Sequence, residues 1–311
     1  MAGLWDLKEF NSGFVIVRPS APSQQLYRMM RQLTAATSNR GINDQEALNM
    51  AVKMMTNRSK HGRVLRTKIL DKSQFMCGTI YFGVYGRLFL FEDSYGPSNQ
   101  LDRPIVAHNN YIITKEAKIY RFREHLMWLY DSDDQYYSSE TRKYLTYTNV
   151  KPTLSSDTPE HVQVKRELSA LKTALAIGHL LNRVVILPRF HCGVAGLQCF
   201  LYAHLHIKTF DSMFSGLYRE SSFLRHPKVP DSVKQGVTEI RFRLHDSQKS
   251  RSPILVSGTD VMRLFSKQRA KVLNLTDLMR VQIDMKDGYF DHEFGSKLQT
   301  PFRRSNYGQS F

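Results

Sequence analysis

The alternation of apolar and polar residues predicts a strand and two helices in the first part of the chain. Phe10–Pro19 is a mostly apolar run and predicts a buried strand. Apolar residues at helical spacing follow from Pro22, which predicts a first helix. A second helix is predicted to begin at Asn43, because Asn43 and Glu46 have the N-cap and N3 spacing of a capping box.

The pattern continues with strands and a further helix. Residues 63–71 and 79–91 predict strands, and Pro104–His108 predicts a short one. A helix is predicted from Thr114, and residues 131–143 are expected to form a polar surface segment. The buried face of that helix is expected to carry Ile119, Phe122, Leu126 and Leu129.

The second half of the chain predicts another α/β unit. Polar residues 151–158 resemble a linker and precede a long amphipathic helix. Strands are then predicted at Val184–Pro188, at Ile254–Gly258 and at Val272–Leu275, with a helix between the last two. Strands that alternate with helices favour a small α/β domain.

Composition narrows the class of protein. The chain has 311 residues, of which 41% are hydrophobic and 23% are charged, as in globular proteins. The net charge of +16 suits a polyanionic partner. The excess charge forms no run of five or more Lys or Arg, and no RNA-binding aromatic signature or zinc-finger spacing accompanies it, so nucleic acid is not favoured as a partner. No apolar stretch is long enough to span a membrane.

Two polar motifs could bind a sugar. Asn11, Ser12 and Gly13 offer an amide, a hydroxyl and an exposed backbone at the start of a strand. Asp44 and Gln45 lie at a helix N-terminus, near the positive end of the helix dipole. Each motif alone is better explained by a turn or by helix capping, but the two together favour a site.

A third motif follows the predicted strand that ends at His108. A histidine at a strand end can ligate a metal ion, and Lys115 lies beyond it in sequence, where a phosphate could be bound. Asn109 and Asn110 lie between them. The alternative is a structural histidine with no ligand.

These motifs, in this order, carry a family resemblance. NSGF followed by VRP, then NDQEALN, then VAHNNYI and KEAKI resemble the nucleotide-diphospho-sugar transferase family, which includes plant arabinosyl- and xylosyltransferases of cell-wall and extensin glycans. Ala170–Gly193 and Tyr218–Pro230 resemble the region that follows this domain in longer members. The resemblance covers roughly residues 9–128 and 145–230.

The resemblance implies a fold, a reaction and a setting. The expected fold is α/β, with residues 1–149 as the C-terminal part of a GT-A (Rossmann-like) glycosyltransferase domain and residues 150–311 as a smaller accessory Rossmann-like α/β domain. The implied activity is transfer of a sugar from a nucleotide-diphosphate donor, UDP-type, to a glycan or glycoprotein acceptor. The implied cofactor is Mn²⁺ or another divalent cation, and the implied compartment is the Golgi lumen.

The resemblance also implies roles for individual residues. Asp44 and Gln45 are the expected catalytic residues near the transferred sugar and the acceptor, and His108 is the expected metal ligand. The expected substrate-binding residues are Asn11, Ser12, Gly13, Asn109, Asn110 and Lys115.

One part of the family pattern is not found. The Asp-x-Asp motif of GT-A enzymes is expected roughly a hundred residues before the Asn-Ser-Gly strand, a distance in keeping with domain size. Only ten residues precede Asn11, and Asp131-Ser132-Asp133 is interpreted as a solvated loop. The chain is therefore expected to be an N-terminally incomplete member. The alternative is a non-catalytic glycan- or polyanion-binding protein that retains the fold.

Two further patterns leave alternatives open. His191, Cys192, Cys199, His204 and His206 form a cluster in sequence. Cys192 and Cys199 could form a disulfide or remain two buried thiols. The spacing of the five residues fits no standard structural zinc site. His179–Pro188 resembles a helix–strand junction of O-fucosyltransferase-like Rossmann domains, which suits a packed accessory domain or an independent donor site.

Overall fold

The chain divides into two compact units. A computed structural model describes residues 2–6, 9–36, 41–57, 65–71, 74–77, 105–110, 114–131, 133–149, 160–192, 197–199, 205–241, 254–276, 278, 281–284, 290 and 292–299. Contacts between residues group Met1–Ile113 as unit 1 and Thr114–Phe311 as unit 2. The domain boundary expected after residue 149 stays a prediction, since compact units need not coincide with family domains.

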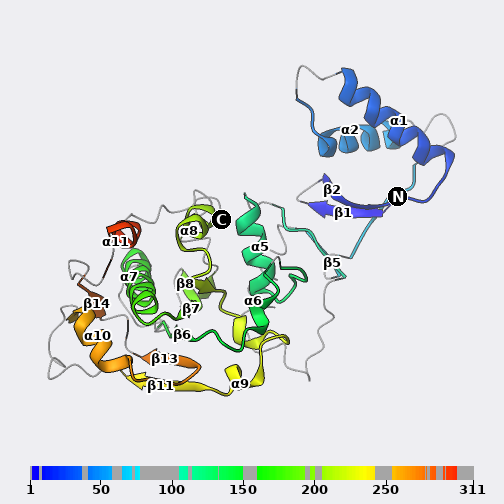
Figure 1. Cartoon of the computed structure of the whole chain (residues 1–311). Helices are drawn as coiled ribbons and strands as arrows, with labels where there is room; N and C mark the ends of the chain where they lie inside the picture. The colour runs from blue at the N-terminus through cyan, green and yellow to red at the C-terminus, as the bar shows by residue number, and fades with distance from the viewer. Residues whose placement is uncertain are drawn as a thin grey trace. The chain divides into compact units, whose positions relative to one another are not determined.

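Unit 1 packs two helices against a small sheet (Figure 1). Strands β1 (Ala2–Asp6) and β2 (Glu9–Ile16) are antiparallel, and β3 (Lys68–Ile69) runs parallel to β1. Helix α2 (Asp44–Asn57) packs on β2 and on α1 (Ala21–Ala36). The first strand and both helices are therefore confirmed. Their apolar stripes meet in one core of Phe10, Leu26, Leu48, Ala51, Val52, Met55 and Leu65.

A second pair of short strands completes unit 1. Strands β4 (Phe75–Met76) and β5 (Val106–Ala107) are parallel, and β5 confirms the short strand predicted before His108. The strand predicted over 63–71 is reduced to the two residues of β3 in the described part. The strand predicted over 79–91 lies outside the described residues.

Unit 2 is built on a five-stranded parallel sheet with the order β10-β7-β6-β13-β11 (Figure 1). The strands are β6 (Tyr144–Tyr147), β7 (Val184–Ile186), β10 (Tyr218–Arg219), β11 (Val237–Arg241) and β13 (Val272–Thr276). Parallel neighbours need crossover connections, and a helix covers the sheet where β6 leads to β7. The mixed α/β class is therefore confirmed, whereas the GT-A arrangement expected for the first domain stays a prediction.

Helix α7 (Glu160–Leu180) makes that crossover and packs against β6 and β7. Sequence spacing predicted an amphipathic helix, but α7 is buried on more than one side, since Ala170, Ala174 and Ala176 are fully covered together with the leucines. The remaining elements are α5 (Lys115–Glu124), α6 (Gln135–Ser138), β8 (Phe190–Cys192), β9 (Leu197–Cys199), α8 (Ile207–Phe214), η4 (Phe223–Arg225), α9 (Asp231–Lys234), β12 (Ile254–Val256), α10 (Gly258–Phe265), β14 (Val281–Ile283) and α11 (His292–Gln299). None of the described helices is both long enough and apolar enough to cross a bilayer.

Asn182 and Arg183, between α7 and β7, hold neighbouring segments of unit 2 together. Asn182 adopts a left-handed φ of 50° that turns the chain from helix to strand. The buried guanidinium of Arg183 donates to the carbonyls of Tyr144 (3.1 Å), Ala270 (2.9 Å) and Gln268 (2.9 Å). One side chain thereby joins the start of β6 to the segment before β13. This role fits the packed accessory domain among the two alternatives.

Helix α5 differs from its prediction. It ends at Glu124, and Leu129, expected on its buried face, is 86% exposed. The helix instead buries Ala117, Tyr120, Arg121 and Glu124. The prediction was wrong because it named only apolar residues for the buried face, whereas here Arg121 and Glu124 are buried as well.

The segment 131–143 is also different from the polar surface segment that was predicted. It contains α6, and Tyr137 within α6 is only 4% exposed. Asp131, interpreted as part of a solvated loop, forms an ion pair with Arg123 and keeps 10% of its side-chain surface. Asp133 pairs with Arg142 and is more exposed.

Candidate functional site

The Asn-Ser-Gly motif forms a bulge in β2. Leu4 pairs with Asn11 and Gly3 pairs with Val15, so the residues between Asn11 and Val15 have no partner in β1. The Asn11 side chain is buried, and its Oδ1 accepts a hydrogen bond from the Gly13 backbone N–H at 2.8 Å. Such a bond from an amide to a residue two positions later stabilises a local turn. Asn11 therefore holds the bulge in shape.

The bulge lies directly against His108. A Cβ atom at Gly13 would lie 2.3 Å from both Cε1 and Nε2 of the His108 ring, which no real Cβ contact allows. Only glycine lets the ring approach the backbone this closely. The structure thus brings together two motifs that are far apart in the sequence. Ser12 beside Gly13 and the His108 ring are both half-buried.

The strand end at His108 is fixed by its backbone. The N–H of His108 donates to the Met76 carbonyl at 2.8 Å, which extends the pairing of β4 with β5 by one residue. The N–H of Asn110 donates to the His108 carbonyl at 3.0 Å. Asn109 is buried and Asn110 is half-buried. These three residues therefore form a short, backbone-anchored segment next to the bulge.

Helix α2 is attached to the same strand. The Asn49 side chain accepts from the Phe10 N–H at 2.8 Å and donates to the Phe10 carbonyl at 2.7 Å. It also donates to the carbonyl of Gln45 at 2.9 Å. One amide group thus fixes the first turns of α2 to the residue preceding Asn11.

The N-terminus of α2 has the predicted capping box. The N–H of Glu46 donates to Asn43 Oδ1 at 2.9 Å, and the N–H of Asn43 donates to Glu46 Oε2 at 3.2 Å. Asn43 and Glu46 are therefore confirmed as caps. Asp44 is the first residue of the helix and is exposed, and Gln45 is half-buried. The Asp44 carboxylate is thus open to solvent at the positive helix end.

His108 offers one candidate metal ligand. Over the described ranges, no group of three or more His, Cys, Asp or Glu side chains could hold a metal ion. These residues therefore do not by themselves form a metal centre. Lys115, predicted to bind phosphate, is exposed at the start of α5 in unit 2. Its role stays a prediction.

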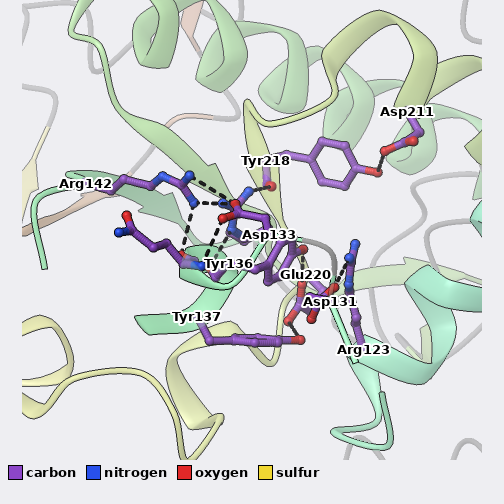
Figure 2. A network of polar contacts seen from close by, with 11 residues as sticks. Arg123, Asp131, Asp133, Tyr136, Tyr137, Arg142, Asp211, Tyr218 and Glu220 are labelled. Carbon is purple, nitrogen blue, oxygen red and sulfur yellow. Dashed lines mark hydrogen bonds and ion pairs between the residues drawn. The ribbon is translucent and has the colours of Figure 1, made fainter. Parts of the chain in front are cut away.

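Unit 2 contains a buried polar network that sequence patterns did not predict (Figure 2). Glu220, directly after β10, is fully buried and accepts from the hydroxyls of Tyr136 and Tyr137, both at 2.8 Å. The guanidinium carbons of Arg123 and Arg219 each lie 4.0 Å from the Tyr136 ring centre. The carboxylate is thus enclosed by hydroxyls and cations.

The edge of the network is closed by further polar pairs. Figure 2 shows Arg142 reaching Asp133, with both terminal nitrogens 3.1 Å from Oδ2, and Arg123 reaching Asp131. The Tyr218 hydroxyl donates to Asp211 at 2.8 Å. Three residues of this network, Tyr218, Arg219 and Glu220, lie in Tyr218–Pro230, a segment noted in the sequence only for its family resemblance.

Burial changes the acid–base properties of this region. Burial, opposed by the charge of Arg121 and reinforced by that of Glu220, raises the pKa of Glu124 to about 8. Burial also raises the pKa of Glu220. It lowers the pKa of His125 well below its usual range. Buried groups with shifted pKa values occur in functional sites and in structural networks alike.

The histidines of the cysteine–histidine cluster have other partners. His191 Nδ1 lies 2.7 Å from Oε1 of the buried Glu167, and His206 caps α8 by accepting from the Thr209 N–H. In the β8–β9 hairpin, Cys192 is paired with Leu197, and Cys199 with Phe190. The alternatives of a disulfide and of two buried thiols therefore stay open for these cysteines. His204 lies outside the described residues.

Comparison with known proteins identifies the first part of the chain. Residues 4–122 match the family model of the nucleotide-diphospho-sugar transferases. No curated protein and no solved structure matches the chain. The match confirms the predicted resemblance for residues 4–122, a segment that includes the bulge of β2, the start of α2 and His108.

Proposed function

With residues 4–122 belonging to the nucleotide-diphospho-sugar transferase family, we propose that this chain transfers a sugar from a nucleotide-diphosphate donor to a glycan or glycoprotein acceptor. The contact of the His108 ring with Gly13 carries the proposal, because it assembles two family motifs into one surface. A UDP-type donor, an arabinosyl- or xylosyltransferase-like specificity and a Golgi-lumen setting belong to the proposal and rest on the family resemblance.

In this proposal the bulge of β2 binds the sugar. Ser12 offers a hydroxyl and Gly13 an exposed backbone, while Asn11 keeps the bulge in shape. The Asp44 carboxylate at the open N-terminus of α2 orients the acceptor hydroxyl or supports positive charge that develops on the sugar. Gln45 adds an amide next to it, and Asn109 and Asn110 extend the polar surface beside His108.

The proposal includes a divalent cation, with Mn²⁺ as the expected ion. His108 would supply one ligand, and such an ion would neutralise charge on the leaving diphosphate. The described residues offer no complete ligand set, so no step of the reaction is derived through the ion.

The test is transfer and hydrolysis of a panel of UDP-sugars by the purified chain, with Mn²⁺ and with a chelator. Asp44→Asn and His108→Ala are each expected to lower turnover at least about tenfold, which corresponds to about 1.4 kcal/mol of activation free energy. Glu9→Gln removes another exposed carboxylate on β2 and should leave turnover unchanged. Absence of turnover with every donor would contradict the proposal, and donor binding without turnover would favour a non-catalytic glycan-binding protein.

A further inference from the structure

The central strand of unit 2 carries buried polar atoms that lack hydrogen-bond partners. Tyr147 is 2% exposed and Asn149 is 5% exposed, and within the described part of the chain neither the Tyr147 hydroxyl nor Asn149 Oδ1 has a partner. An unsatisfied buried polar atom costs about 1–3 kcal/mol. Most native proteins have few such atoms, so two at one strand end require an explanation.

The surroundings of these two atoms are polar and closely connected. The Asn149 side-chain amide donates to the Arg189 carbonyl at 3.2 Å. Two residues later, His191 contacts the fully buried Glu167 twice, through its ring Nδ1 at 2.7 Å and its backbone N–H at 3.0 Å. Burial and, to a smaller extent, the negative charge of Glu167 raise the pKa of Tyr147. All of these groups therefore lie near one another.

Glu167 fixes the orientation of the His191 ring. With Nδ1 held by the carboxylate, the second ring nitrogen is directed away from Glu167. His191 keeps 6% of its side-chain surface, whereas Glu167 keeps none. Gln163 also donates to Glu167, at 3.0 Å, so the carboxylate is satisfied by protein groups. The histidine, and not the glutamate, is thus the group available to a ligand.

The position in the sheet is the one where α/β proteins bind ligands. The chain runs from β6 outward through β7 to β10 and then returns on the other side of β6 through β11 and β13. Ligands of open parallel sheets bind at the carboxyl ends of the strands where this direction reverses. On β13, next to β6, Asn274 Oδ1 and Thr276 Oγ1 are also buried without a partner among the described residues.

We propose that the carboxyl end of β6 in unit 2 binds a saccharide ring through Tyr147, Asn149 and His191. An amide oxygen, a phenol and an imidazole nitrogen are suited to hydroxyl groups, and the nearby Glu167 carboxylate disfavours a phosphate at this point. The ring comes from a free glycan or from the sugar of a sugar nucleotide. All residues concerned belong to unit 2, so this proposal uses none of the residues assigned above to transfer.

The test is calorimetric titration of the full chain with a neutral arabino-oligosaccharide and, separately, with UDP-arabinose. Tyr147→Phe removes only the hydroxyl and should weaken binding of the true ligand by about 3-fold to 10-fold. Tyr144→Phe is the matched control, because the Tyr144 hydroxyl is also buried without a partner among the described residues, on the same strand, but at its amino end. It should leave binding unchanged.

Three outcomes decide the proposal. Weaker binding of the oligosaccharide by Tyr147→Phe assigns the site to a glycan, and weaker binding of UDP-arabinose alone assigns it to a sugar nucleotide. Equal binding by Tyr147→Phe and Tyr144→Phe, or no binding of either probe by the wild-type chain, overturns it. The thermal midpoint of ligand-free Tyr147→Phe should not fall, since no protein bond is lost. Tyr147→Phe should weaken binding by the same factor in the His108→Ala background as in the wild-type background, which separates this test from the test of transfer.

Discussion

The two units treat their polar residues in opposite ways. In unit 1 the polar motif residues Gly13 and Asp44 are exposed, and buried Asn11 and half-buried Asn49 attach to the backbone. In unit 2 the charged residues close to β10 are buried and bond to each other's side chains. The polar residues of unit 1 are therefore available to a ligand at small cost, whereas most of those in unit 2 hold the fold together.

The largest expected effect is the loss of the buried carboxylate in unit 2. Glu220→Ala leaves the hydroxyls of Tyr136 and Tyr137 without their acceptor and removes a negative charge near Arg123, so unit 2 should lose about 3–5 kcal/mol of unfolding free energy. This loss can be measured by chemical denaturation of the chain and by hydrogen exchange of the backbone amides of β7 and β10. Glu239→Ala, at an exposed glutamate on β11, should change it by less than about 0.5 kcal/mol. Equal effects would show that the buried Glu220 contributes no more to stability than an exposed glutamate.

The second effect is a pH dependence expected in unit 2. Because the pKa of Glu124 is raised to about 8, the folded chain keeps a proton that the unfolded chain releases from about pH 4.5 upward. Unfolding free energy should therefore fall as pH rises from about 6.5 towards 8, by up to about 1.4 kcal/mol per pH unit, whereas at lower pH the lowered pKa of His125 gives an opposing slope. Glu124→Gln should reduce this slope, with the remainder due to Glu220. Thermal melts across this range measure it, and Glu116→Gln on the same helix should keep the slope because Glu124 is intact.

The third effect tests the close approach in unit 1. Gly13→Ala places a methyl group against the His108 ring and should destabilise unit 1 by about 1–3 kcal/mol. The double variant Gly13→Ala with His108→Ala should recover most of this loss, because the ring is gone. In unit 2, Gly295→Ala meets no atom within 4 Å and should stabilise α11 by about 0.5–1 kcal/mol. A Gly13→Ala chain as stable as the wild type would show that the contact is not tight.

The smallest effect should be the same in both units. Asn43→Ala removes the cap of α2, and Ser257→Ala removes that of α10, whose Oγ accepts from the Asp260 N–H at 3.1 Å. Each should cost about 1 kcal/mol, because helix capping is local and does not depend on the surrounding core. Hydrogen exchange of the first turn of each helix measures the cost. A difference of several-fold would mean that the units also differ in local structure.

Local signals predicted local structure well. The capping box of α2 and the strands β7, β12 and β13 follow from spacing and apolar runs within a few residues. The contact of Gly13 with His108 and the bonds of Tyr136 and Tyr137 to Glu220 join residues far apart in the chain, and no local pattern encodes them.

Apolar spacing alone did not predict the buried face of one helix. The helix α5 has a basic and acidic sequence that is typical of a solvated face, yet Arg121 is fully buried and Glu124 is 5% exposed. The reason is that burial of a charge depends on a partner elsewhere in the fold. Here Arg121 and Arg189 partly offset the buried charge of Glu124, and Ser221 donates to its carboxylate. The candidate residues of unit 1 were found from motif order, and their roles stay predictions.

The place of β6 in the sheet has a consequence for synthesis of the chain. Its partner β13 lies far downstream, so during translation β6 and β7 leave the ribosome well before Val272–Thr276 exists. Until then β6 has an unpaired edge, and Arg183 lacks the carbonyls of Gln268 and Ala270. The nascent unit 2 is therefore exposed to aggregation, and its sheet becomes continuous only when this late strand is made.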